Sequence, residues 1–60
     1  MNAIAKKDVK TSKGLKVKAG KDYSIYQFMA YTGQTLYRVF VSETESFVIN
    51  EVTLKRLFTI

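Results

Sequence analysis

The sequence predicts a mainly β fold, either a small five-stranded barrel or a strongly bent antiparallel sheet, with one short helical turn near the C-terminus. Apolar and polar residues alternate along residues 15–20 and again within residues 36–50, and this two-residue period is typical of strands with one buried face. Glycine and small polar residues separate the alternating segments, as expected for turns. After residue 50 the apolar residues recur at three- and four-residue spacings, which indicates a helical turn.

The first third of the chain is expected to contain two strands joined by a turn. Residues 3–9 are predicted to form the first strand, with Ile4 as its main core residue. Residues 11–14 read Thr-Ser-Lys-Gly, small polar residues followed by one that tolerates positive φ, so a turn is expected there. In residues 15–20 the apolar positions are predicted to face the core while the lysines face solvent.

Residues 23–31 form a second apolar segment with apolar side chains on both faces. β-Branched and aromatic residues favour a strand over a helix here. One side of this strand would carry Tyr23, Ile25, Met29 and Tyr31, and the other Tyr26, Phe28 and Ala30. The strand is therefore expected either to be covered on both faces or to present an apolar outer face. Residues 32–35 are predicted to connect it to the next strand.

Residues 36–50 are predicted to form a β-hairpin around the polar turn at residues 42–46, although the strong Asn-Gly or Asp-Gly turn signal is missing. Alternation places Tyr37, Val39 and Val41 on one side of its first arm and Leu36 and Phe40 on the other, while Phe47 and Ile49 share a face of the second arm. The phenylalanines Phe40, Phe47 and Phe58 are expected to fill the core. Replacing Phe40 or Ile49 by alanine is expected to cost about 2–5 kcal/mol, out of a total stability of about 3–9 kcal/mol for a chain of this length.

The last eleven residues are predicted to form a helical turn followed by a short closing strand. Either Asn50 or Thr53 is a suitable N-cap. Leu54, Leu57 and Phe58 would share one face of the turn. No repeat or linker divides the chain, so residues 1–60 are expected to form a single domain.

The composition excludes most catalytic chemistry. The chain has no cysteine and no histidine, which removes disulfides, thiolate metal sites and the usual general base. The five carboxylates are scattered, and the glycines are too far apart for a phosphate-binding loop. We therefore predict a protein that is not an enzyme and has no cofactor and no metal site. No secretory signal or membrane span is recognised, so a cytoplasmic protein is expected.

The net charge of +5 comes mainly from the first third, because residues 1–22 contain seven lysines and only two acidic residues, Asp8 and Asp22. Two interpretations remain open. Lysines on exposed strands can simply oppose edge-to-edge aggregation. They can also form a patch that binds phosphates or an acidic protein.

Short motifs give the chain a resemblance to a known fold family. The segment GKDYSI at residues 20–25 resembles the Gly-Lys-x-Tyr-x-Val start of a strand in many short SH3-like proteins, and residues 37–39 (YRV) and the pair Leu57-Phe58 resemble their later strand and closing turn. The resemblance covers nearly the whole chain and implies an SH3-like small barrel, of the kind found among short bacteriophage accessory proteins. The chain lacks the Ala-Leu-Tyr-Asp-Tyr stretch and the tryptophan of peptide-binding SH3 domains, so polyproline recognition is not expected. An OB-type barrel is the alternative fold.

Two functions are consistent with these features. The first is a protein-interaction module, which the resemblance would make a phage-encoded modulator or inhibitor of a host protein in the host cytoplasm. The alternative is a nucleic-acid-binding barrel that uses the lysines and an exposed tyrosine. Pairing of two copies through a strand edge or a sheet face is also open. In each case the candidate binding residues are Lys16, Lys18, Lys21, Tyr26, Phe28, Tyr31 and Arg38.

Overall fold

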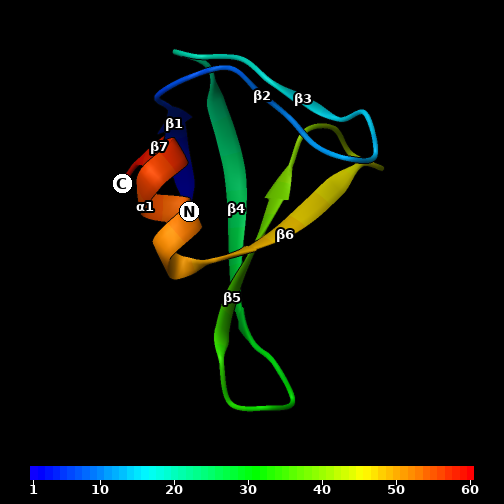
Figure 1. Ribbon diagram of the computed structural model, residues 1–60, viewed down its shortest axis with the longest axis vertical. Coiled ribbons are helices and arrows are strands. Elements are labelled where there is room, and N and C mark those ends of the chain that lie inside the picture. Colours follow the sequence, from blue (N-terminus) through cyan, green and yellow to red (C-terminus); the bar gives the residue numbers. More distant parts are fainter.

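The computed structural model describes all residues from 1 to 60 and is built around one bent antiparallel sheet with a short helix beside it (Figure 1). The five strands of the sheet lie in the order β6-β5-β4-β1-β7, and a separate two-stranded hairpin is formed by β2 and β3. The predicted mainly β fold, with one short helical turn near the C-terminus, is confirmed. The strands are β1 (Asn2–Ala5), β2 (Val9–Lys10), β3 (Lys16–Val17), β4 (Asp22–Met29), β5 (Thr35–Phe40), β6 (Ser46–Asn50) and β7 (Phe58–Thr59), and the helix is α1 (Glu51–Leu57).

Three consecutive strands, β4, β5 and β6, form the larger part of the sheet. The predicted hairpin within residues 36–50 is confirmed as β5 and β6, which pair from Leu36–Asn50 to Phe40–Ser46. β4 pairs with β5 along six residues, from Ser24–Phe40 to Met29–Thr35. The turn between these two strands contains Gly33 at φ +91°, a left-handed conformation that glycine adopts without steric cost.

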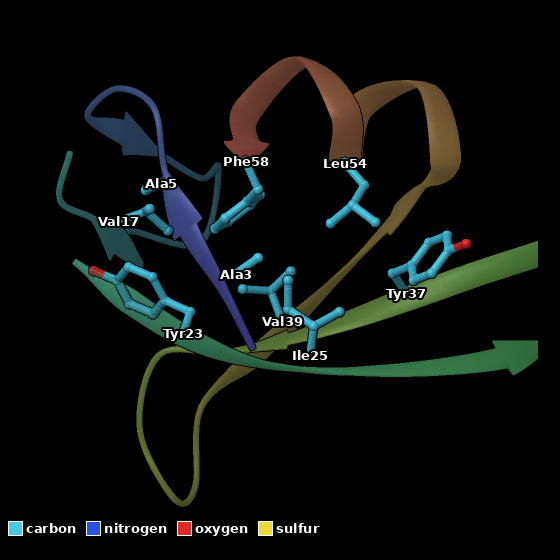
Figure 2. Close-up of a cluster of buried hydrophobic side chains, with 9 residues drawn as sticks. All are labelled: Ala3, Ala5, Val17, Tyr23, Ile25, Tyr37, Val39, Leu54 and Phe58. Atoms are coloured by element: carbon cyan, nitrogen blue, oxygen red, sulfur yellow. The ribbon is translucent and has the colours of Figure 1, made fainter. Parts of the chain in front are cut away.

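The sheet is completed by the first and last strands. β1 lies between β4 and β7 and pairs with both. The expectation that Ile4 is the core residue of this strand is wrong. Ala3 and Ala5 are buried, whereas Ile4 is 50% exposed on the other face. Only small side chains face inward from β1, because the rings of Tyr23 and Phe58 occupy the space beside it (Figure 2).

The predicted helical turn is confirmed as α1, and of the two suggested N-caps the structure has Asn50, while Thr53 lies within the helix. The Asn50 side chain accepts a hydrogen bond from the Thr53 backbone N–H at 2.8 Å, which satisfies one of the free donors of the first turn. Leu54 and Phe58 are buried and Leu57 is half-buried, so the predicted face of the turn packs on the sheet. The protein has no helix long and apolar enough to cross a bilayer.

The core lies between the inner face of the sheet and α1 (Figure 2). Phe58 and Leu54 point from the helix end of the chain toward Ile25 and Val39 of the sheet, and all four side chains are almost fully buried. Tyr23 packs edge-on against Phe58, with ring centroids 6.2 Å apart. Its hydroxyl accepts a hydrogen bond from the Lys18 backbone N–H at 2.8 Å, so burial of the ring leaves no polar group unpaired.

Of the three phenylalanines expected to fill the core, only Phe58 does so. Phe40 is half-buried and lies on the outer face of β5, because Val39 occupies the inward position before it. Phe47 and Ile49 do face the core, but they are only half-buried because β6 is the edge strand of the sheet. The predicted loss of stability from Phe40→Ala assumed that this side chain is fully buried, and it is therefore too high.

The first third also differs from prediction. The strand expected at residues 3–9 is divided into β1 and β2, with Lys6, Lys7 and Asp8 between them. The turn at residues 11–14 is confirmed by a hydrogen bond from the Gly14 N–H to the Thr11 carbonyl. In the alternating segment that follows, Val17 is buried, but Ala19 is exposed.

Candidate binding surface

The outer face of the sheet carries a group of aromatic and apolar side chains with one arginine. In β4, Tyr23 and Ile25 point into the core, so alternation directs Tyr26 and Phe28 to the opposite face. The register of β4 with β5 places Arg38 directly opposite Tyr26, and the register of β5 with β6 places Val48 opposite Arg38. We call this surface the aromatic face and define it by Tyr26, Phe28, Leu36, Arg38, Phe40 and Val48.

The side chains of the aromatic face hold each other in place. The rings of Tyr26 and Phe28 are stacked, with centroids 6.2 Å apart and planes 15° from parallel. The Arg38 guanidinium lies 5.8 Å from the centroid of the Phe28 ring, within cation–π distance. Arg38 also donates a hydrogen bond from Nη1 to Ser46 Oγ at 3.0 Å. The arginine is therefore fixed on the sheet while its charge stays near the surface.

The aromatic face is open to solvent. Tyr26 is 60% exposed and Val48 is 42% exposed. Helix α1 packs on the inner face of the sheet, with the core between them (Figure 2). Large apolar side chains exposed together on one face are characteristic of interaction sites.

The turn between β4 and β5 projects away from the body of the protein at one end of the sheet (Figure 1). Tyr31, in the turn itself, is 91% exposed, and Met29, at the end of β4, is 71% exposed. Sequence reasoning included Tyr31 among the candidate residues but missed Met29, which alternation placed with the core residues Tyr23 and Ile25. The signal for Met29 is its position next to the turn, where the strand has already passed the end of the core.

The candidate lysines lie elsewhere. Lys16 is in β3, directly opposite Lys10 of β2, and Lys18 and Lys21 are in the connection from β3 to β4. Lys21 Nζ lies 5.6 Å from the centroid of the Tyr23 ring. Tyr26 follows Lys21 by five residues along an extended strand, which corresponds to about 16 Å. The structure thus brings together Tyr26, Phe28 and Arg38, with Tyr31 at the end of the same hairpin, and separates them from the three lysines.

The chain matches no family model, no curated protein and no solved structure.

The aromatic face combines flat apolar groups with one fixed cation. Stacked rings offer flat apolar area, and the guanidinium offers a fixed set of hydrogen-bond donors to a carboxylate or phosphate. No group of three or more acidic, cysteine or histidine side chains lies close enough together to hold a metal ion. These groups are chemically complementary to an apolar patch that carries a negative charge.

Proposed function

We propose that this protein is a non-catalytic protein-interaction module that binds its partner through the aromatic face and the neighbouring β4–β5 turn. The observation that carries the proposal is the stacked pair of Tyr26 and Phe28 beside Arg38 on an open sheet face. Tyrosine, phenylalanine, methionine and arginine are enriched in protein interfaces, and tyrosine and arginine are enriched among the residues that dominate binding energy. The resemblance to short phage proteins adds the proposal that the partner is a host protein.

The position of the charges supports a protein partner in particular. Arg38 is the only charged residue of the aromatic face, and it is surrounded by apolar side chains. A surface with one fixed cation among rings resembles the core of a protein interface, where charged residues are few. Binding to a nucleic-acid backbone uses many cations, and the lysines lie on other elements of the fold.

Site-specific photo-crosslinking tests the proposal. We would introduce p-benzoylphenylalanine at Tyr31 or Tyr26 and irradiate the protein in an extract of its source cell. A control protein would carry the same group at Val52 of α1, which is 66% exposed. We expect one protein to be crosslinked from the two tyrosine positions and not from position 52. Equal labelling from all three positions would contradict the proposal.

Affinity measurements with the captured partner then define the contribution of each side chain. Tyr26→Ala and Arg38→Ala should each weaken binding by about tenfold or more, as central interface residues do. Val52→Ala should leave binding unchanged. If the tyrosine and arginine variants bind as well as the unmodified protein, the aromatic face is not the interface.

A second candidate function, nucleic-acid binding, is favoured by one specific observation. Lys10 and Lys16 lie directly opposite each other in the β2–β3 hairpin, where like charges repel, and a bound phosphate would relieve that repulsion. This function predicts binding of labelled DNA or RNA that weakens steeply with salt and is lost in a Lys16→Glu/Lys18→Glu double variant. Fluorescence anisotropy at two salt concentrations measures both effects, and absence of binding at tens of micromolar protein excludes this function.

A further inference from the structure

A groove of about 620 Å³ lies along the edge of the sheet, between β6 and the segment of β2 that leads into the hairpin turn. This volume is in the range of about 300–1,000 Å³ that is typical of ligand sites. β6 is the last strand on its side of the sheet, and β2 belongs to the other sheet. Figure 1 shows the two strands diverging from the tip of the β2–β3 hairpin. The groove is lined by Val9, Thr11, Ser12, Lys13, Arg38 and the β6 residues 46–49.

The backbone of β6 offers unpaired hydrogen-bonding groups to this groove. The Val41 N–H donates to the Glu45 carbonyl, which makes these two residues a hydrogen-bonded pair of the β5–β6 ladder. Such pairs alternate along antiparallel strands, so Phe47 and Ile49 bond to β5. The N–H and C=O groups of Ser46 and Val48 therefore point away from β5, toward the free edge.

The other border of the groove is formed by β2 and the hairpin turn. The Thr11 N–H donates to the Leu15 carbonyl, so by the same alternation the backbone groups of Lys10 point away from β3. The groove is lined by Val9 of β2 and by Thr11, Ser12 and Lys13 of the hairpin turn, and neither Lys10 nor β3 lines it. The unpaired backbone groups that border the groove are therefore those of β6, while β2 contributes the side of Val9.

The side chains define what such a groove would accept. Val9, Phe47 and Ile49 pack against the core from the inner side, and they form its apolar part. On the outer side, the charged side chains in the lining are Lys13 and Arg38, both cationic. An extended chain presents alternate side chains to opposite sides. Its apolar residues would meet the inner part, and acidic residues would meet the two cations.

We propose that this groove binds an extended segment of a partner protein in which apolar and acidic residues alternate. The segment adds to β6 as a further antiparallel or parallel strand between β6 and β2. Main-chain hydrogen bonds to Ser46 and Val48 hold it, while the alternate side-chain contacts select it. This site is separate from the binding mode proposed above for the aromatic face, and Arg38 and Val48 lie at the border of both.

Titration of the ¹⁵N-labelled protein with a capped heptapeptide of alternating glutamate and valine tests the proposal. The added strand should slow hydrogen exchange of the Val48 amide by about tenfold or more, since an exposed amide becomes hydrogen-bonded. The Phe47 amide, already bonded to β5, should change little. The same peptide with lysine in place of glutamate should bind about tenfold more weakly or worse, because its charges meet Lys13 and Arg38.

Two variants separate the backbone contribution from the charge contribution. Val48→Pro removes an N–H donor that points to the free edge and leaves the hydrogen bonds to β5 in place. Sheets tolerate proline at such an edge position, so this variant should fold but no longer bind the peptide. Lys13→Glu should weaken binding by about fivefold or more. Lys7→Glu makes the same charge change at an exposed residue outside the groove and should bind normally. If Val48→Pro does not fold, the same backbone hydrogen bonds can be tested by changing the peptide. N-methylation of the peptide amides that point toward β6 should weaken binding, and N-methylation of the amides that point the other way should weaken it less.

Several results would overturn the proposal. These are no binding at about 1 mM peptide, equal binding of the lysine peptide, or binding that leaves the Val48 amide unprotected. A concentration-dependent dimer that protects this amide without peptide would also overturn it and assign the edge to a second copy of the chain. Tyr26→Ala should leave peptide binding unchanged, so failure here and failure of the aromatic-face proposal are distinguishable.

Discussion

Two isoleucines on neighbouring strands give a direct test of which face of the sheet is the core. Ile25 of β4 is 2% exposed, whereas Ile4 of β1 is 50% exposed. Ile25→Ala removes buried methyl groups and leaves a cavity, at a cost of about 2–5 kcal/mol. Full burial of an isoleucine side chain contributes about 1.5–3 kcal/mol, so Ile4→Ala, at half exposure, should cost only about 1 kcal/mol.

Urea unfolding followed by circular dichroism measures this difference. For a small protein the free energy of unfolding falls by about 1 kcal/mol per molar urea, so the midpoint should fall by about 1 M in Ile4→Ala and by several molar in Ile25→Ala. The whole protein is stable by only about 3–9 kcal/mol, and Ile25→Ala can therefore be unfolded in buffer.

The milder pair Ile25→Val and Ile4→Val keeps the comparison measurable in that case. Ile25→Val should cost about 0.5–1.5 kcal/mol, which lowers the melting temperature by roughly 4–8 °C per kcal/mol in a domain of this size. Ile4→Val should have a smaller effect. A loss from either Ile4 variant that equals or exceeds the loss from its Ile25 counterpart would refute the assignment of the core to the Ile25 face.

Three further substitutions test the polar and backbone features of the fold. Tyr23→Phe removes the hydroxyl that accepts the Lys18 N–H and should cost about 1–3 kcal/mol in a urea titration. Tyr37→Phe, at a buried ring whose hydroxyl is not a buried unpaired group, is the control and should cost less. Asn50→Ala should lower stability by about 1 kcal/mol through loss of the helix N-cap, and Asn50→Ser should restore most of it; equal melting temperatures for the two would contradict the capping role. Gly33→Ala should cost about 1–2 kcal/mol because φ is +91° there, and Gly33→Asn should cost less, with calorimetry showing whether this order holds.

The sequence predicted the strands better than the residues that fill the core. Alternation located β5 and β6 and grouped Tyr37 with Val39 on one face. Assignment by residue type then failed at Phe40, because a large apolar side chain was taken as a core residue although alternation placed it opposite Val39. It failed again in β1, where the available space admits alanine and not isoleucine. The space available at each core position depends on aromatic rings contributed by residues far away in the sequence.

The candidate site could be predicted only in part for a similar reason. The two-residue period was sufficient to place Tyr26 and Phe28 together on one face. The placement of Arg38 beside them depends on the register between β4 and β5, which is set by the geometry of the turn and not by any local pattern. The groove at β6 depends on the order of strands in the sheet, which leaves that strand at the edge. Local periodicity does not determine strand order.

The pairing of β1 with β7 has a consequence for how fast the protein folds. β4, β5 and β6 are consecutive in sequence and neighbours in the sheet, so their contacts close short loops. Ala5 and Phe58, which pair with each other, lie almost the whole chain length apart, and closing that longer loop costs about 1–2 kcal/mol more in chain entropy. We expect the three-strand unit to form in the folding transition state and β7 to join afterwards. In stopped-flow kinetics, Val39→Ala should then slow folding, while Phe58→Leu should mainly speed unfolding.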